Sequence, residues 1–354
     1  MRFTLAIRSL RTHVRRDSNY AHAYALLATA CQLRSLLDPD GEWLQEADAA
    51  IAKALSIAPT LAEGYDARAG NSLYRGRVRE SLDDFLTAYE LEPGNGRACA
   101  RLAHAYHVLG RADRAMLWYA KATRRETQPF YADNIGDIWT DLAEYSKAEK
   151  AYNTAAIFQP DLPVSAIGLS RIELFRGEAD KARVRCERAR EKCKSNPQLL
   201  MMAAQIEFFS RNFVKAENLY SELMKGDHAG GVDYHGSIRF LSAIGFIHAT
   251  TGFADGNALL NEALALDEKE LSAAKDNPAR LYSLAADYAA LGEGEASLDA
   301  LASAIKAGWI DYRSMELDPR FDAVRAAPQF REVISAIAVR VTQMRMASRS
   351  HQNQ

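Results

Sequence analysis

Small and apolar residues recur along this chain with the spacing of amphipathic helices, and the helices themselves recur at a longer interval. Pro129, Pro163 and Pro197 are 34 residues apart, and each stands where a helix can begin. The same interval separates Ala148, Ala182 and Ala216. We therefore predict an all-α chain built from antiparallel helix pairs that repeat every 34 residues.

The segment 129–162 shows how one pair would pack. Gly136 in the first helix and Ala148 and Ala155 in the second are small, so the two backbones can approach closely. Tyr152 lies between the two alanines and would fill the remaining gap, and Pro160 ends the second helix. A single pair cannot bury its own apolar face, so the pattern requires several stacked pairs.

These positions resemble the tetratricopeptide repeat, whose pattern is W-x2-L-G-x2-Y, then A-x3-F, then proline. Gly136 and Trp139 match the first part, Ala148 and Tyr152 match the second, and Ala132 replaces the initial tryptophan. The resemblance implies a right-handed superhelical solenoid of about eight helix pairs with a C-terminal capping helix.

The repeat pattern divides the chain into regions of different regularity. An orphan helix precedes the first complete repeat, so either the chain was cut from a longer one or this helix is a cap. We predict an orphan or capping helix at 1–20, regular repeats at 21–228, looser pairs at 229–313, and a capping segment with a frayed tail at 314–354.

The segment 317–330 departs from the repeat and reads L-x-x-DP-x-F-x-x-x-R-x-x-P-x-F with small variations. It is similar to the end of many bacterial tetratricopeptide modules. The repeat at 21–60 has seven extra residues between its two helices, around 36–41. Together with this interrupted repeat, the segment resembles the modules attached to bacterial nucleotide cyclases, winged-helix activators and Ser/Thr kinases. In those proteins the repeats sense or recruit, and another domain acts.

The resemblance also implies where a ligand would lie, because first helices line the concave face of such a solenoid. Positions 2, 5, 9, 12 and 13 of each repeat then face the groove. The candidate groove residues are Arg97, His104, His107, Phe130, Asp133, Asp137, Asp141, Ile167, Arg171, Leu174, Phe175, Met201, Gln205, Phe208 and Phe209.

Two features of this set suggest a ligand. Asp133, Asp137 and Asp141 are spaced by four and form one stripe; either Arg97 or Arg171 compensates them internally, or a basic partner does. An apolar run is either exposed in the groove or part of the core, and it comprises Leu174, Phe175, Met201, Phe208 and Phe209. If exposed, the two features predict a peptide that alternates basic and apolar residues.

Composition narrows the classes of partner. The net charge of −2 and the isoelectric point near 6.5 do not indicate direct nucleic-acid binding, and no apolar run is long enough to insert in a membrane. The four cysteines, Cys31, Cys99, Cys186 and Cys193, lack metal-ligand or redox spacing, which favours reduced thiols in the cytoplasm.

No nucleophile elbow, phosphate loop, zinc motif or nucleotide fingerprint occurs in the chain. We therefore expect no enzyme, no cofactor and no metal, although spacing alone would allow His104 and His107 to meet Asp133 and Asp137. The sequence predicts a cytoplasmic scaffold or adaptor that binds a protein or peptide segment. The alternatives are a regulatory module of a larger bacterial signalling protein, and a scaffold that self-associates through its N-terminal helix.

Overall fold

The computed structural model is all-α, which confirms the predicted fold class. It describes residues 2–35, 42–124, 131–160, 162–194, 196–225, 231–232 and 237–352. Within these ranges the only β-type pairing is a single bridge between Val232 and Arg239. No described helix combines the length and the apolar character needed to cross a lipid bilayer.

The chain forms two compact units, which are described separately below. Unit 1 comprises 1–108 and 118–127, and unit 2 comprises 109–117 and 128–354, so the helix α7 (Ala112–Thr123) is divided between them. The predicted regions at 1–20, 21–228, 229–313 and 314–354 concern the regularity of the repeats and remain predictions.

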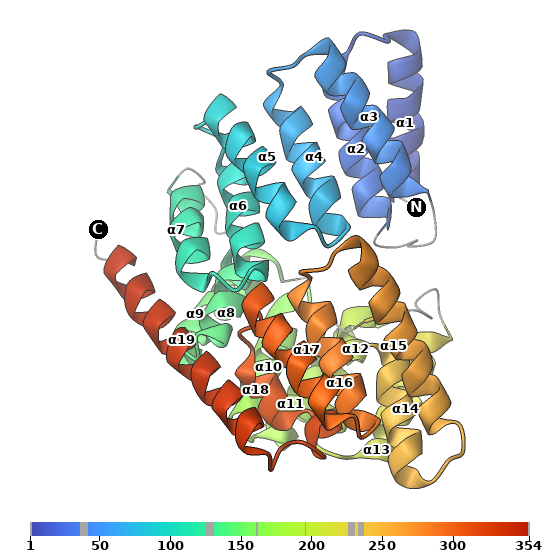
Figure 1. Cartoon of the computed structure of the whole chain (residues 1–354). Coiled ribbons are helices and arrows are strands. Elements are labelled where there is room, and N and C mark those ends of the chain that lie inside the picture. The colour runs from blue at the N-terminus through green and yellow to red at the C-terminus, as the bar shows by residue number, and fades with distance from the viewer. Residues whose placement is uncertain are drawn as a thin grey trace. The chain divides into compact units, whose positions relative to one another are not determined.

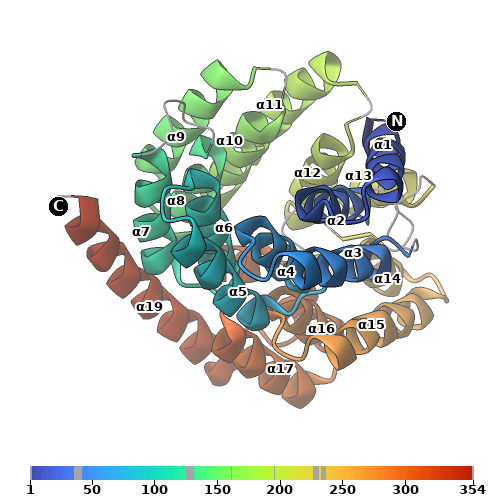
Figure 2. The same cartoon turned by 90° about the horizontal axis from the view of Figure 1, so that it is seen from above.

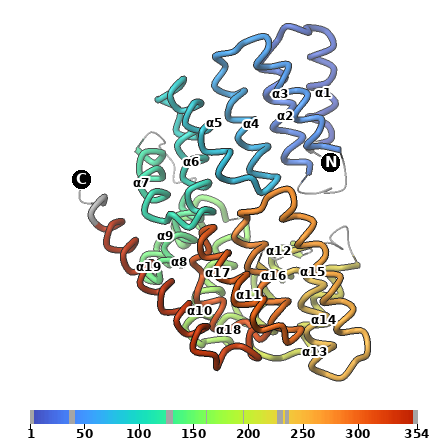
Figure 3. Tube along the Cα trace, viewed as in Figure 1, coloured from blue at the N-terminus to red at the C-terminus, as the bar shows by residue number. Residues whose placement is uncertain are grey.

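Unit 1 consists of antiparallel helices that follow one another along the chain, as the tube in Figure 3 shows. Its complete helices are α1 (Arg2–Arg16), α2 (Ala21–Ser35), α3 (Trp43–Ile57), α4 (Ala62–Tyr74), α5 (Val78–Leu91) and α6 (Gly96–Val108). Figure 1 shows α1 to α5 side by side. The helix α1 lies within the segment 1–20, where the sequence predicts a helix, and it buries Ile7 and Val14, one from each half of its length, against the core of α2 and α3.

Unit 2 continues the alternation of first and second helices. Its helices are α8 (Ala132–Asp141), α9 (Tyr145–Phe158), α10 (Val164–Phe175), α11 (Ala179–Lys192), α12 (Pro197–Phe209), α13 (Phe213–Met224), α14 (Phe240–Thr251), α15 (Gly256–Ala273), α16 (Pro278–Ala290), α17 (Gly294–Ala307), α18 (Tyr312–Leu317), the 3₁₀ helix η1 (Pro319–Phe321) and α19 (Pro328–Gln352). Seen from above, these helices succeed one another along a curve (Figure 2).

The close approach predicted from the small residues is present in the first pair of unit 2. Tyr152 of α9 is buried and lies against Gly136 of α8 and Gly168 of α10. A Cβ atom at Gly136 would come within 2.6 Å of the Tyr152 ring, and one at Gly168 would come closer still. The tyrosine therefore fits only because both facing positions lack a side chain.

The turn between the two helices of a pair also repeats. Gly76, Gly110, Ala143, Gly177 and Arg211 occupy this turn, and all five have positive φ. Glycine adopts this left-handed conformation without steric cost, whereas the Cβ of Ala143 (φ 55°) and Arg211 (φ 60°) makes it unfavourable. The repeat therefore dictates the backbone of the turn even where the residue does not suit it.

The helix α15 of unit 2 is longer than its neighbours α14 and α16. The charged stretch after Leu266 continues α15 as far as Ala273. Asp267 within it is fully buried, and two arginines pair with it. The extension is therefore part of the core.

Candidate binding face

Six of the candidate groove residues in unit 2 are buried and cannot line an open groove. They are Ile167, Arg171, Leu174, Gln205, Phe208 and Phe209, each at most 6% exposed. Of the two alternatives left open for the apolar run, Leu174, Phe208 and Phe209 have the buried one, and Phe208 packs edge-on against Tyr220 and Phe246 inside the unit. The assignment of ligand-binding residues remains a prediction.

The C-terminal segment contributes to this burial, because it contacts α10 and the apolar cluster of unit 2. Second helices pack on one side of α10, α12 and α14. On the other side, Asp311 reaches Arg171 at 2.8 Å, Asp322 reaches Arg211 at 2.8 Å, and Leu317 packs against the apolar cluster of α12 and α14. First helices that are covered on both sides bury their whole circumference.

Arg171 lies at the centre of this contact. Its Nη2 group donates to Asp141 at 3.0 Å and to Asp311 at 2.8 Å. Burial alone would lower the pKa of Arg171, but the two carboxylates outweigh it and raise the pKa above its ordinary value. Arg171 therefore stays charged and fastens the C-terminal segment to α8 and α10.

The aspartate stripe on α8 has partners inside the protein. Tyr152 donates to Asp137 at 2.6 Å, Arg171 donates to Asp141, and Asn134 donates to Asp133 at 2.9 Å. Burial and the adjacent Asp137 raise the pKa of Tyr152 well above its usual range, so the phenol keeps the proton that it donates. The internal cation considered for this stripe is therefore Arg171.

The other candidates of unit 2 are less enclosed. Phe175 is half-buried with the Arg171 guanidinium 5.0 Å from its ring centre, and Met201 is half-buried beside the apolar cluster. Phe130 lies outside the described residues.

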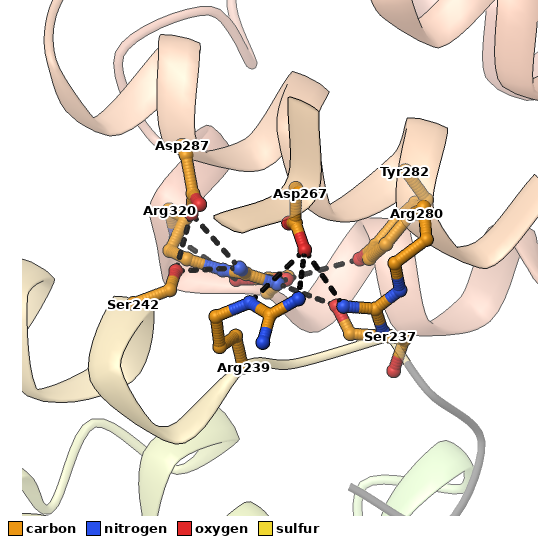
Figure 4. Close-up of polar contacts among 9 residues, drawn as sticks. Ser237, Arg239, Ser242, Asp267, Arg280, Tyr282, Asp287 and Arg320 are labelled. Carbon is orange, nitrogen blue, oxygen red and sulfur yellow. Dashed lines mark hydrogen bonds and ion pairs between the residues drawn. The ribbon is translucent and has the colours of Figure 1, made fainter. Parts of the chain in front are cut away.

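A second contact of the C-terminal segment is a buried polar network, drawn in Figure 4. Arg320 is fully buried; it donates to Asp318 at 2.7 Å and to Ser237 O at 3.2 Å, and it pairs with Asp287 at 3.2 Å. Ser242 of α14 also bonds Asp287. The predicted capping motif therefore carries an arginine that ties η1 to α14 and α16.

In unit 1, by contrast, two arginines of α6 remain partly accessible and share one carboxylate. The Asp66 carboxylate of α4 forms ion pairs with the guanidinium groups of Arg97, at 3.1 Å, and of Arg101, at 3.4 Å. The side chain of Asp66 is 10% exposed, whereas those of Arg97 and Arg101 are 54% and 22% exposed. A single carboxylate therefore pairs with two guanidinium groups, and it is less exposed than either of them.

Gly70 of α4 is the point where three first helices meet. A Cβ atom there would lie 2.9 Å from Gln32 Oε1 of α2 and 3.2 Å from Arg101 Nη1 of α6. Gln32 is fully buried; its Nε2 donates to Ala67 O at 2.6 Å, while its Oε1 accepts no hydrogen bond from any described residue. A larger residue at Gly70 would displace the arginine.

His104 follows Arg97 and Arg101 on the same side of α6 and is exposed, while His107 is half-buried. We call the surface formed by Gly70, Arg97, Arg101 and His104 the first-helix face of unit 1. Its charge is positive because two arginines stand over one aspartate. Across the described ranges, no three His, Cys, Asp or Glu side chains gather closely enough to hold a metal ion.

The candidates predicted from the sequence include Arg97, His104 and His107 of this surface, and do not include the neighbouring Arg101, Asp66 and Gln32. Asp66 and Gln32 occupy groove positions of the repeat, and Arg101 lies one helical turn after Arg97. A search for opposite charges at groove positions of consecutive repeats would have paired Asp66 with Arg97.

Comparison with known proteins gives the fold and no closer relationship. No family model matches the chain, and no curated protein sequence matches it. PilF of Pseudomonas aeruginosa aligns over 59% of this chain and 92% of its own, with 16% identity and a TM-score of 0.45. The type IV pilus biogenesis factor PilW aligns over 57% and 93%, with 18% identity and a TM-score of 0.45.

Human IFIT1, in its dimer with PPP-AAAA, is similar over a larger part of this chain. It aligns over 85% of this chain and 77% of its own, with 15% identity and a TM-score of 0.51. IFIT1 is a helical repeat protein of the tetratricopeptide type. The similarity and the 34-residue period lead to the same conclusion: this chain has the tetratricopeptide-repeat fold.

Proposed function

We propose that this chain is a non-catalytic scaffold that binds an extended acidic segment of another protein across the first-helix face of unit 1. The observation that carries the proposal is the sharing of Asp66 by Arg97 and Arg101. One carboxylate neutralises one of two guanidinium groups, so positive charge remains on an accessible surface. A guanidinium has five N–H donors, and the bond from Arg97 to Asp66 uses one of them.

The acidic character of the segment follows from where the charges remain accessible. In unit 2 the aspartates that had suggested a basic ligand are already bonded to Tyr152, Arg171 and Asn134. In unit 1 the arginines are held in place by Asp66, which reduces the entropy lost when a ligand carboxylate binds. Charge-assisted hydrogen bonds of this kind are shorter and stronger than neutral ones.

A selection from a random peptide library tests this proposal. The wild-type chain should enrich peptides rich in Asp and Glu, and the double variant Arg97→Glu, His104→Glu should lose that enrichment. The matched control is Lys150→Glu, Lys192→Gln, which makes the same change of net charge, with His104 neutral, at exposed sites of unit 2. Peptides of neutral or basic composition, or equal selection by both variants, would exclude the first-helix face as the site.

Self-association through α1 is a second candidate, and one observation favours it. The outward side of α1 keeps Leu5 58% exposed among the exposed arginines Arg8 and Arg15. Sedimentation velocity at rising protein concentration tests it. A dimer that Leu5→Glu abolishes supports the candidate, and a monomer at every concentration eliminates it.

A cytoplasmic location is also part of the proposal, and the cysteines support it. Burial raises the pKa of Cys31 to about 12 and that of Cys186 to about 11. Both are free thiols packed in the interior, and a reducing compartment keeps thiols in this form.

A further inference from the structure

A hollow of about 270 Å³ lies between α11 and α13, over α12. Its apolar surface comes from Ala203, Ile206, Leu219 and Cys186. Sites for whole small molecules usually measure about 300–1,000 Å³. This hollow is therefore sized for one bulky side chain rather than for a complete cofactor.

The second helix beside this hollow has a smaller side chain than its neighbours at one position of the repeat. Tyr152 and Tyr220 occupy the same position of the repeats before and after, and both are buried. The corresponding residue of α11 is Cys186, whose side chain is much smaller. Ala182 and Cys186 are the only fully buried residues that α11 contributes among its described positions, so this helix fills little of the space beside α12.

The charged side chains around the hollow are not balanced. Glu207 receives Arg183 Nε at 3.1 Å on both oxygens and Asn212 at 3.0 Å, so its charge is compensated. Arg190 and Lys215 also line the hollow, and neither forms an ion pair with any described residue. With Glu207 and Arg183 paired, the other charged residues of the lining are the cations Arg190 and Lys215 and the single carboxylate of Glu187.

Apolar surface extends beyond the hollow on both sides. Val184 is 46% exposed and precedes the lining residue Glu187 by three positions; Val214 is 72% exposed and precedes the lining residue Asn218 by four. Residues at these spacings lie on one side of a helix, so the two valines flank the opening. Exposed apolar side chains grouped around a hollow mark an interaction site.

We propose that this hollow binds a leucine or aromatic side chain from an acidic segment of a partner protein. The apolar side chain enters between α11 and α13, and the carboxylates beside it in the segment bind Arg190 and Lys215. This site lies on the second helices of unit 2. It is therefore additional to the first-helix face of unit 1 and does not depend on it.

Short synthetic peptides test the proposal on the full-length chain by calorimetry. The probe is the capped peptide EEFEE, and its matched controls are EEAEE and KKFKK. All measurements use the background Arg97→Glu, His104→Glu, which removes acidic binding at the first-helix face. EEFEE should bind at least about tenfold more tightly than either control peptide. Equal affinity of EEFEE and EEAEE would overturn the proposal.

Protein variants then locate the binding. Arg190→Glu with Lys215→Glu should weaken EEFEE about fivefold or more, because attraction becomes repulsion. Lys192→Glu, at an exposed position of α11 outside the hollow, should leave the affinity unchanged. An affinity for EEFEE that the double reversal does not alter would also overturn the proposal.

Filling the hollow provides a test that does not depend on charge. Ala203→Leu places a larger side chain on the floor and should abolish the preference for EEFEE over EEAEE. If that variant does not fold, Asn218→Trp offers the same test from an exposed position at the rim. A preference that persists in the folded, filled variant would show that the phenylalanine binds elsewhere.

Discussion

Replacing Arg320 by methionine should loosen the contact between the C-terminal segment and the other helices of unit 2. The guanidinium is fully buried between Asp318 and Asp287, and it also donates to Ser242 and to Ser237 O. Methionine is of similar length and would occupy much of the same space. Since the packing is largely kept, the change isolates the loss of charge and hydrogen bonds.

The magnitude follows from what the substitution leaves behind. Both carboxylates are 0% exposed, and Tyr282 donates to Asp318 at 3.0 Å but cannot neutralise it. Breaking a buried ion pair by removing one partner costs about 3–5 kcal/mol. We expect a loss of that size in the free energy of unfolding of unit 2.

The matched control is Arg211→Met. Arg211 also joins the C-terminal segment to an earlier part of unit 2, the turn between α12 and α13, through Asp322 at 2.8 Å, but the two side chains are 45% and 46% exposed. An exposed pair contributes about 0.2–1 kcal/mol. The two substitutions therefore each remove an ion pair of the C-terminal segment, one buried and one exposed to solvent.

Hydrogen–deuterium exchange with mass spectrometry is the suitable assay, because it reports each segment separately. Arg320→Met should speed exchange in peptides covering 311–330 and in α14 and α16, while unit 1 stays unchanged. Arg211→Met should have a much smaller effect. The reasoning is refuted if the two variants behave alike, or if Arg320→Met lowers protection equally in unit 1.

Two further predictions concern the interior of unit 2. Burial raises the pKa of Asp287 to about 7, although Arg320 acts to lower it. An unfolded aspartate has a pKa of about 3.9. The folded state therefore holds the extra proton, and the free energy of unfolding should fall as pH rises from about 4 to about 7 and then level off. Urea titrations across this range should show a smaller slope in Asp287→Asn. Separately, Gly168→Ala drives a methyl group into the buried Tyr152 ring and should cost about 1–3 kcal/mol; an unchanged melting temperature would contradict this packing.

The repeating pattern was sufficient to predict the local structure. Small residues such as Gly136 and Ala148 at helical spacing specify which sides of two neighbouring helices meet. Such contacts join residues within one repeat or the next, so the sequence pattern contains both partners. This is why the all-α fold and the close approach of the two helices at Gly136 and Tyr152 followed from the sequence, whereas the contact of Tyr152 with Gly168 of the next repeat was not predicted.

Whether the first helices of unit 2 line an open groove could not be predicted in this way. Whether the inner side of α10 and α12 is open depends on a segment that returns from much later in the chain. Asp311 is 140 residues after Arg171, and no periodicity relates them. The all-round apolar character of α12 was a usable signal, because a helix with no polar side is expected to be covered on every side.

The sequence by itself therefore determined the helix pairs, their turns and the small residues at which they touch, because these depend on neighbours at fixed spacing. Only the tertiary structure decided which first helices stay accessible. The C-terminal segment covers α10, α12 and α14 with its own side chains, whereas Arg97 and His104 of α6 keep their exposure. The physical reason is that burial depends on the whole path of the chain, and amphipathic spacing describes one helix at a time.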